Sequence, residues 1–375
     1  VLITRYKDLI QVYKDAHTFS SDKKIEFTPK FGDAPHLLVH HTTSLIFNDP
    51  PLHTQVRQIM MGALTRRAID QMETSLTELV SKLADNIEAQ GGGDLIEDFA
   101  AAIPIEVIGN LLNIPHDERG PLRDWSLAIL GALEPKISDT QAQRGDKAVA
   151  EFLEYLKLLV ADRRANPGNP ESDVLTRLIQ GERSDNGQRL SENELLHNCI
   201  FILNAGHETT TNLIGNALVA LEEWPVQKEL LIKRIAESVH DKSSLDDVLN
   251  TAVDEFLRFE SSNQLGNRRA TVDCVVGGFP LAKGTLITLC IGSANRDPAQ
   301  FEHAEEMDIT RPNCKHLSFA FGIHQCAGMH LARLEARVAL QIFLQRFPNY
   351  KLTAAPTRGG RARFRGFLNA PFSIS

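Results

Sequence analysis

The first feature able to do chemistry is a single cysteine, Cys326, in the run FAFGIHQCAG at residues 319–328. A helical pattern follows at residues 329–347, with apolar residues at helical spacing and Pro348 after it. The positive end of that helix should favour the thiolate form of the cysteine, and Gly322 and Gly328 should let backbone amides approach the sulfur. Such a thiolate can act as a nucleophile, a redox sensor or a haem axial ligand, and the spacing fits a buried structural thiol equally well.

A second candidate lies in the middle of a long helical pattern at residues 191–223, which contains the run AGHETTT at residues 205–211. The pattern opens with a capping box formed by Ser191 and Glu194, and it ends before Pro225. Glycine and three consecutive threonines are poor helix formers. Their place at the centre of an apolar helix is a local conflict typical of a functional site, and a kink with Glu208 turned to solvent is the alternative.

Two further pairs of polar residues lie at helical spacing. His53 and Arg57 are four residues apart in the run NDPPLHTQVR at residues 48–57, and the proline at position 51 can begin a helix there. Glu255 and Arg258 are three residues apart, so they share a helix face and can form an ion pair. Both patterns are common on ordinary solvated helices, and neither indicates a function by itself.

The elements that must position these residues are predicted to be mainly helical. Loops are predicted at residues 21–47 and 166–172, and strands at residues 1–4, 268–276, 285–292 and 371–375. Helical patterns cover residues 6–15, 51–61, 68–90, 94–112, 118–133, 146–165, 173–180, 191–223, 225–237, 244–260 and 329–347.

Length and composition set outer bounds on fold and function. The chain has 375 residues, of which 42% are hydrophobic and 23% charged, as in ordinary globular proteins. The length fits two or three domains by rough rule, although the absence of a Gly-, Ser- or Pro-rich linker leaves one large domain open. A net charge of −8 argues against general affinity for nucleic acid or an anionic membrane. No apolar run approaches the roughly 18 residues of a membrane span, and no signal peptide is recognised.

The cysteines do not form a recognisable framework. There are five of them, an odd number without any Cys-x-x-Cys pair, which argues against a disulfide scaffold or a zinc site and fits a reducing cytoplasm.

Taken together, the motifs resemble those of the cytochromes P-450, particularly the soluble bacterial ones. The run at residues 319–328, followed by LARLE at residues 331–335, is similar to the haem-binding loop of that family, with Ala320 where the family usually has glycine. The run AGHETT resembles the oxygen-activation motif. The segment around His53 resembles a propionate-binding helix, and Glu255, Arg258 and Arg311 match the members of a buried ion network.

The resemblance implies a role for each matching residue. Cys326 is the expected proximal iron ligand, and Thr209 and Glu208 are expected to help deliver protons to bound oxygen. The other residues expected at the cofactor are His53, Arg57, Ala205, Arg269, Phe319, Gly322, His324 and Gly328.

The resemblance also implies the fold and the activity. Residues 1–375 are expected to form a single cytochrome P-450 domain, mainly α with a small β region, with haem b between the long helix and the cysteine loop. An N-terminal segment of the family is expected to be missing before Val1. The expected reaction inserts one oxygen atom from O2 into an apolar small molecule by hydroxylation or epoxidation. Two electrons would come from NAD(P)H through a ferredoxin reductase and a ferredoxin. The protein is expected to be a cytoplasmic monomer without nucleic-acid or membrane partners.

Two alternatives remain open from the sequence. One is a peroxygenase driven by hydrogen peroxide, against which the intact Glu208-Thr209 pair argues, because such an enzyme needs no oxygen-derived proton relay. The other is a non-enzymatic haem-binding or gas-sensing protein, against which the lack of an attached signalling domain argues. Turnover with NAD(P)H-driven redox proteins separates the three.

Overall fold

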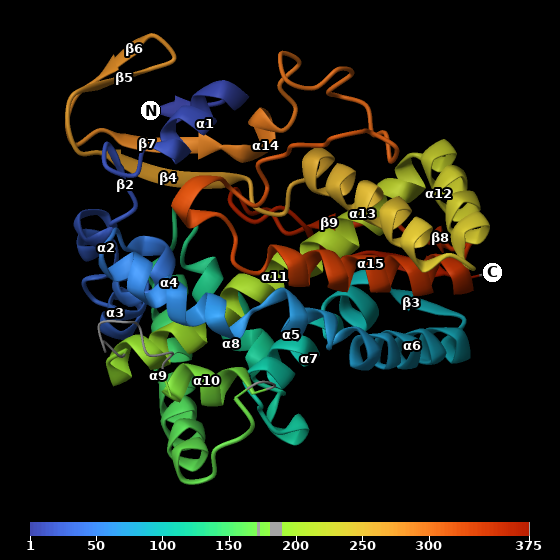
Figure 1. Ribbon diagram of the computed structural model, residues 1–375, viewed down its shortest axis with the longest axis horizontal. Coiled ribbons are helices and arrows are strands. Elements are labelled where there is room, and N and C mark those ends of the chain that lie inside the picture. Colours follow the sequence, from blue (N-terminus) through green and yellow to red (C-terminus); the bar gives the residue numbers. More distant parts are fainter. Residues whose placement is uncertain (171–172, 181–189, 375) are drawn as a thin grey trace.

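The computed structural model describes residues 1–170, 173–180 and 190–374 (Figure 1). Most of these residues are helical. The α-helices are α1 (Tyr6–Lys14), α2 (Lys24–Phe31), α3 (Pro35–Thr43), α4 (Leu52–Ala63), α5 (Arg66–Asp70), α6 (Glu73–Gln90), α7 (Ala102–Leu111), α8 (Leu122–Gly131), α9 (Asp139–Ala165), α10 (Val174–Gln180), α11 (Glu192–Glu223), α12 (Pro225–Ser238), α13 (Lys242–Phe259), α14 (Ile291–Ala294) and α15 (Met329–Arg346). Short 3₁₀ turns lie at η1 (Leu45–Phe47), η3 (His116–Glu118) and η4 (Gly322–His324), and η2 (Leu95–Ala100) is a π-helix.

The strands form four small sheets. The largest has the order β1-β7-β4-β2, in which β1 (Leu2–Ile3) runs parallel to β7 (Leu286–Cys290) and β4 (Leu265–Ala270) pairs antiparallel with β7 and with β2 (Phe19–Ser20). A second sheet joins β3 (Gly92–Asp94), β11 (Pro371–Ser373) and β8 (Lys351–Leu352). The other two are the pairs β5 (Cys274–Val276) with β6 (Phe279–Leu281), and β9 (Thr357–Arg358) with β10 (Phe367–Asn369).

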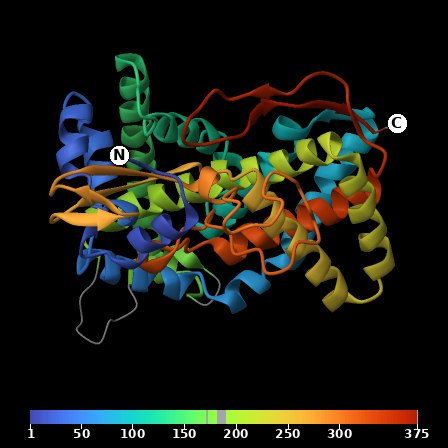
Figure 2. The same ribbon diagram turned by 90° about the horizontal axis from the view of Figure 1, so that it is seen from above.

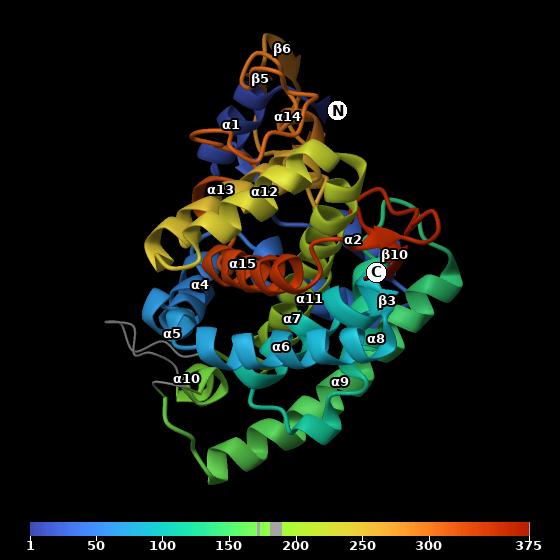
Figure 3. The ribbon, with the colours of Figure 1, turned by 90° about the vertical axis from the view of Figure 1, so that its right-hand side faces the viewer.

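Helix α11 is the centre of the helical part. It contacts α3, α7, α8, α9, α12, α13 and α15, and Figure 3 shows α15 lying between α13 and α6. A capping box of Ser191 and Glu194 begins α11, because it satisfies amide groups that have no partner within the helix. Gly206 allows the close approach of α7, since a Cβ at that position would come 2.9 Å from Ile108 Cδ1.

The hydrophobic core is divided into a large and a small cluster. The large cluster fills the space between the helices, and the small one lies beneath the four-stranded sheet, between it and α1. In Figure 2 the C-terminal segment that carries β9 and β10 runs along one side of the helical part. Among the described residues, no helix is both long and apolar enough to cross a membrane.

The structure confirms the ends of α11, α12, α13 and α15 to within two residues, but the predicted loop at residues 21–47 is wrong. Helices α2 and α3 and the turn η1 occupy it. Pro29, Gly32 and Pro35 suggest breaks, yet Phe27 and Phe31 bury one helix face and Pro35 occupies the first helical position of α3, where proline is favoured.

The other differences concern element ends. Helix α9 begins at Asp139, where Ser138 and Gln141 form a second capping box, rather than at the predicted residue 146. The predicted helix at residues 68–90 is divided into α5 and α6, and the predicted strand at residues 268–276 into β4 and β5. The predicted loop at residues 166–172 lies partly outside the described residues.

Candidate functional site

The middle of α11 presents one accessible strip. Ala205 is exposed and Thr209 is partly exposed, although His207, Glu208 and Thr210 beside them are buried. Residues four apart share a helix face, so Ala205 and Thr209 lie one above the other. The Thr209 hydroxyl donates a hydrogen bond of 2.8 Å to the Ala205 carbonyl oxygen. The helix is therefore continuous here, and the threonine bonds back to the preceding turn as expected.

The Cys326 loop is folded by backbone hydrogen bonds and one close contact. The Cys326 amide donates to the Phe319 carbonyl oxygen at 2.9 Å, and the Gln325 amide donates to that of Gly322 at 3.0 Å. Gly322 has φ +74°, and a Cβ there would lie 2.3 Å from the Tyr13 carbonyl oxygen, so this position requires glycine. Cys326 is exposed, and α15, which begins three residues later, packs against α11.

The Gly328 amide approaches the Cys326 sulfur as predicted, although the backbone at this position does not require glycine. Gly328 has an ordinary φ of −90°, and a Cβ there would meet no atom within 4 Å, so its contribution is an amide hydrogen bond to the sulfur. Although Cys326 is accessible, the protein around the sulfur desolvates it and raises the pKa of the thiol, while the Gly328 amide and the charges of Arg57 and Arg333 oppose that rise. Desolvation of the sulfur therefore outweighs the groups around it that favour the thiolate.

Ala320 adopts a left-handed backbone conformation with φ +54°, which costs a residue with a Cβ roughly 1–2 kcal/mol. We expect Ala320→Gly to raise the free energy of unfolding by about 0.5–1 kcal/mol, after allowing for the greater freedom of glycine in the unfolded chain. Urea unfolding measures the change. Ala332→Gly in α15 is the control, expected to destabilise by about 1 kcal/mol. Equal destabilisation by both variants would contradict the prediction.

A group of cations and imidazoles surrounds the Cys326 loop. The ring centroids of His53 and His324 are 4.1 Å apart, and the Arg57 guanidinium donates to the Gln325 carbonyl oxygen at 2.7 Å. Among the described residues, both ring nitrogens of His53 and Nε2 of His324 are buried without a hydrogen-bond partner. Burial lowers the pKa of His53 to about 4 and that of His324 to about 2. Because buried polar atoms are normally hydrogen-bonded, these nitrogens and the Arg57 guanidinium fit an acidic group that binds among them, as the propionates of haem would.

The structure places Arg268, not the predicted Arg269, beside this group. Arg268 is buried, and its charge contributes to the low pKa values of His53 and His324. Arg269 instead donates to Glu26 at 3.0 Å and to the Gly284 carbonyl oxygen at 2.8 Å. Both residues belong to β4, where successive side chains point to opposite faces. The sequence motif located the strand but not which of its two faces meets the histidines.

Glu208 is turned towards the C-terminal segment. Its Oε1 accepts a hydrogen bond of 2.5 Å from Nη1 of Arg361, and its Oε2 is buried with no partner in the part of the chain that the structure describes. Burial raises the pKa of Glu208 to about 7, while the Arg361 charge opposes the rise and Glu134 adds to it. A carboxyl group with a pKa near neutrality can both give and take a proton. No pattern in the sequence indicated Arg361 as its partner.

The predicted ion network is confirmed. Glu255 and Arg258 are completely buried and joined by two hydrogen bonds of 2.7 and 2.8 Å. Nε of Arg311 donates to Oε2 of Glu255 at 3.0 Å. The Arg258 guanidinium also donates to the carbonyl oxygens of Asn295, Ala304 and Glu306. The network therefore ties α13 to the segment that precedes the Cys326 loop.

A buried histidine cluster lies between α3 and α11, and sequence reasoning missed it. The ring centroid of His40 lies 5.1 Å from that of His41 and 5.6 Å from that of His197, and Asn204 approaches His40 Nε2 at 3.4 Å. Burial lowers the pKa of His41 to about 3, helped by the charges of Lys30, Arg363 and His197. Histidines within a predicted loop are expected to be solvated, so only the neighbouring phenylalanines of α2 pointed to burial. The described residues contain no group of three or more His, Cys, Asp or Glu able to hold a metal ion.

Because these histidines are buried, we expect the stability of the folded protein to decrease in acid. The pKa of His197 is lowered to about 4 by burial and by His36, and that of His40 is lowered by burial and by His41 and His197. The unfolded chain binds protons below about pH 6.5 while the folded chain does not. Stability therefore falls as the pH drops through 6.5, by about 2 kcal/mol at pH 5 for each of His41 and His197, and His40 acts in the same direction.

The effect of one histidine is testable with His41→Phe, because its ring is packed against Phe27, Phe31 and Phe47 and both of its nitrogens lack partners. We expect the loss of unfolding free energy between pH 7 and pH 5 to be about 2 kcal/mol smaller than in the parent, as measured by urea unfolding at both pH values. The exposed His116→Gln is the control and should behave as the parent does. An unchanged pH dependence in His41→Phe would show that this histidine does not contribute.

Comparisons with known proteins agree with this arrangement. A family model described as Cytochrome P450 matches residues 128–357. Cytochrome P450 107B1 of Saccharopolyspora erythraea is 35% identical over 371 residues, covering 95% of this chain and 84% of that protein. The biotin biosynthesis cytochrome P450 of Bacillus subtilis is 31% identical over 350 residues, which cover 93% of this chain and 84% of that protein. The solved structure of P450BioI in complex with hexadec-9Z-enoic acid ligated acyl carrier protein is 30% identical, with a TM-score of 0.90 over 100% of this chain and 92% of that one.

The chain belongs to the cytochrome P450 family. Within it, the chain is a monooxygenase of the bacterial type, and haem is the cofactor that the family implies.

Proposed function

We propose that this protein is a haem-thiolate monooxygenase in which the sulfur of Cys326 would hold the iron of haem b. The observation that carries the proposal is the group of unpartnered polar atoms around the cysteine loop. His53 and His324 offer buried nitrogens without partners, and Arg57 and Arg268 add positive charge. Groups of this kind hold carboxylates in an otherwise apolar site, and haem b carries two.

Each remaining residue has a proposed task. Haem, when bound, supplies the reductive activation of dioxygen. Arg57, Arg268, His53 and His324 hold and orient its acidic groups. Gly328 donates its amide to the cysteine sulfur, and Gly322 keeps the loop against Tyr13. The predicted contact residues Phe319 and Ala205 shape the two sides of the site, and Arg269 is replaced in this proposal by Arg268.

Proton delivery is assigned to Thr209 and Glu208. The Thr209 hydroxyl lies on the accessible strip of α11, where it can donate to or accept from a bound molecule once its bond to Ala205 exchanges. Glu208 holds a proton near neutral pH on a carboxyl group whose Oε2 has no partner. The two side chains lie on adjacent faces of α11, so a water molecule is needed to pass a proton between them.

Electrons are proposed to come from NAD(P)H through a ferredoxin reductase and a ferredoxin, and the substrate is proposed to be an apolar small molecule that is hydroxylated or epoxidised with O2. A peroxygenase would instead turn over with hydrogen peroxide alone, and a sensor would not turn over. Glu208 favours the monooxygenase, because a buried carboxyl with a pKa of about 7 suits proton delivery. The single domain, the monomeric state and the cytoplasmic location remain predictions.

The decisive experiment is the carbon-monoxide difference spectrum of the dithionite-reduced protein. We expect a strongly red-shifted Soret band in the parent, because a thiolate ligand donates electron density to the iron, and its loss in Cys326→His. Cys274→Ser, a cysteine of the β5–β6 hairpin, is the matched control and should keep the band. A haem-loaded parent without the shifted band, or a Cys326→His variant that keeps it, would overturn the proposal.

A further inference from the structure

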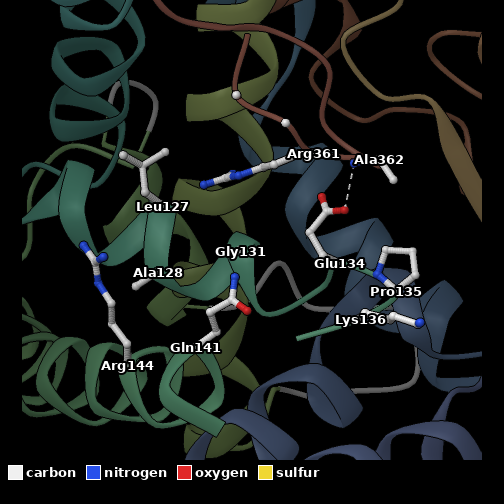
Figure 4. Close-up of a pocket in the computed structure, with 12 residues that line it drawn as sticks. Leu127, Ala128, Gly131, Glu134, Pro135, Lys136, Gln141, Arg144, Arg361 and Ala362 are labelled. Carbon is white, nitrogen blue, oxygen red and sulfur yellow. Dashed lines mark hydrogen bonds between the residues drawn. The ribbon is translucent and has the colours of Figure 1, made fainter. Parts of the chain in front are cut away.

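An open cavity of about 610 Å³ lies between α8, the first turns of α9 and the C-terminal segment (Figure 4). Leu127 and Ala128 of α8 and Pro135 of the following connection supply apolar surface. A volume of this size is within the range that small-molecule sites occupy. The cavity combines elements that are more than 200 residues apart in the sequence, so its composition was not apparent from any local motif.

The charge around this cavity is predominantly positive. Lys136, Arg144 and Arg361 line it, against one carboxylate, that of Glu134. In the part of the chain that the structure describes, neither Lys136 nor Arg144 forms an ion pair. The Glu134 carboxylate is already engaged, because it accepts hydrogen bonds of 3.0–3.3 Å from the backbone amides of Ala362 and Arg363. The cavity therefore has cationic donors in excess over free acceptors.

Arg361 has donors to spare. Its Nη1 binds Glu208, whereas its Nη2 lies on the cavity side, 3.9 Å from where a Cβ on Gly131 would be. Figure 4 shows the Arg361 side chain extending across the cavity towards Leu127. A guanidinium carries five N–H donors in a fork that suits two acceptors at once. The same side chain can thus hold Glu208 with one edge and face a bound anion with the other.

We propose that this cavity binds the anionic head group of an amphiphilic small molecule, with Lys136, Arg144 and Arg361 as its partners and with Leu127, Ala128 and Pro135 against the start of the apolar chain. A carboxylate and a phosphate monoester share the required chemistry. The inference deepens the proposed function and rests on it, because Arg361 lines this cavity and also binds Glu208, so that the bound molecule would be the substrate of the proposed monooxygenase. It also makes Arg361 the residue shared between substrate recognition and Glu208.

The test is calorimetric titration of the haem-loaded protein with three probes that share a ten-carbon chain: decanoate, decyl phosphate and methyl decanoate. We expect decanoate or decyl phosphate to bind about tenfold more tightly than the neutral ester, the effect of one charge-assisted hydrogen bond. Preference for decanoate indicates a carboxylic acid as the natural head group, and preference for decyl phosphate indicates a phosphate.

Variants connect the preference to the cavity. The double variant Lys136→Gln, Arg144→Gln should weaken binding of the preferred anion about three- to tenfold and that of the ester less than twofold, and Arg361→Gln should act in the same direction. Lys147→Gln is the control for the loss of surface charge, because this exposed α9 residue also loses a positive charge, one instead of the two in the double variant, but does not line the cavity. It should bind as the parent does.

Equal affinity for the anions and the ester would overturn the proposal. So would an anion preference that survives unchanged in both the double variant and Arg361→Gln, or equal weakening by Lys147→Gln, which would indicate a diffuse effect of net charge. These outcomes are separable from failure of the proposed function, because the carbon-monoxide spectrum reports the iron ligand whatever the calorimetry shows.

Discussion

Replacing Arg258 by alanine is expected to lower the free energy of unfolding by about 3–5 kcal/mol, because it leaves the buried Glu255 carboxylate without its principal partner. Arg258 has no exposed surface, and its five hydrogen bonds include three to backbone carbonyl oxygens, which would also lose their donors. With native stabilities of roughly 5–15 kcal/mol, a loss of this size leaves little margin. We therefore expect low yields of folded protein and little bound haem, as measured by urea unfolding and by haem content.

Two comparisons make this result interpretable. Arg66→Ala removes an arginine whose side chain is 81% exposed, and it should change the free energy of unfolding by no more than about 0.5 kcal/mol. Arg258→Lys keeps the charge but cannot reproduce the fork that binds Glu255 and three carbonyl groups, so it should fall between the parent and alanine. An Arg258→Ala protein as stable as the parent would show that the network is not needed for folding.

Replacing Glu208 by glutamine is expected to reduce product formation about 100-fold at pH 7, the lower range for loss of a positioned acid or base. Glutamine has nearly the same shape and can still contact Arg361, but it cannot transfer a proton. Burial raises the pKa of Glu208 to about 7, and the positive charge of Arg361 opposes that rise. If Glu208 gives the proton, turnover by the parent should fall above pH 7, approaching tenfold per pH unit, as the carboxyl loses its proton.

The measurement is the rate of product formation, with NAD(P)H oxidation followed in parallel, between pH 6 and pH 9, with the protein saturated in haem. The Glu208→Gln variant should show a low rate without this descending limb, since it has no titrating group at that position. Glu223→Gln, an exposed residue at the end of the same helix, is the control and should keep both the rate and the pH profile. A Glu208→Gln rate within twofold of the parent would remove Glu208 from the proton path.

Much of the helical fold was predictable because its signals are local. The Ser191 capping box and Pro225 fix the two ends of α11, and apolar spacing with Pro348 does the same for α15. The loop prediction failed at residues 24–43 since proline and glycine there mark helix starts and junctions rather than a continuous loop. The capping box at Ser138 is a local signal as clear as that at Ser191, and it would have placed the start of α9 correctly.

In the candidate site, too, the residues within local motifs were predictable from the sequence, whereas the contacts between distant segments were not. Cys326, His53 and Arg57 lie in contiguous motifs, so their types and spacing identified them, and the structure brings their loops together. The pairing of Glu208 with Arg361 joins residues 153 positions apart, and no periodicity within either segment indicates it. The cavity cations were equally hidden, because Lys136, Arg144 and Arg361 become neighbours only when the C-terminal segment folds over α8.

The alternation of Arg268 and Arg269 on β4 has a consequence for recombining this protein with its relatives. The strand is held in register with β7 along its length, from Leu265 opposite Cys290 to Arg269 opposite Leu286. A crossover that inserted or deleted one residue in β4 would exchange the two faces, directing Arg269 towards the histidines and Arg268 towards Glu26. Both positions would still be arginine, so the exchange would escape an alignment that compares residue types alone. Chimeras joined within this strand therefore have to conserve the number of residues between Leu265 and Ala270.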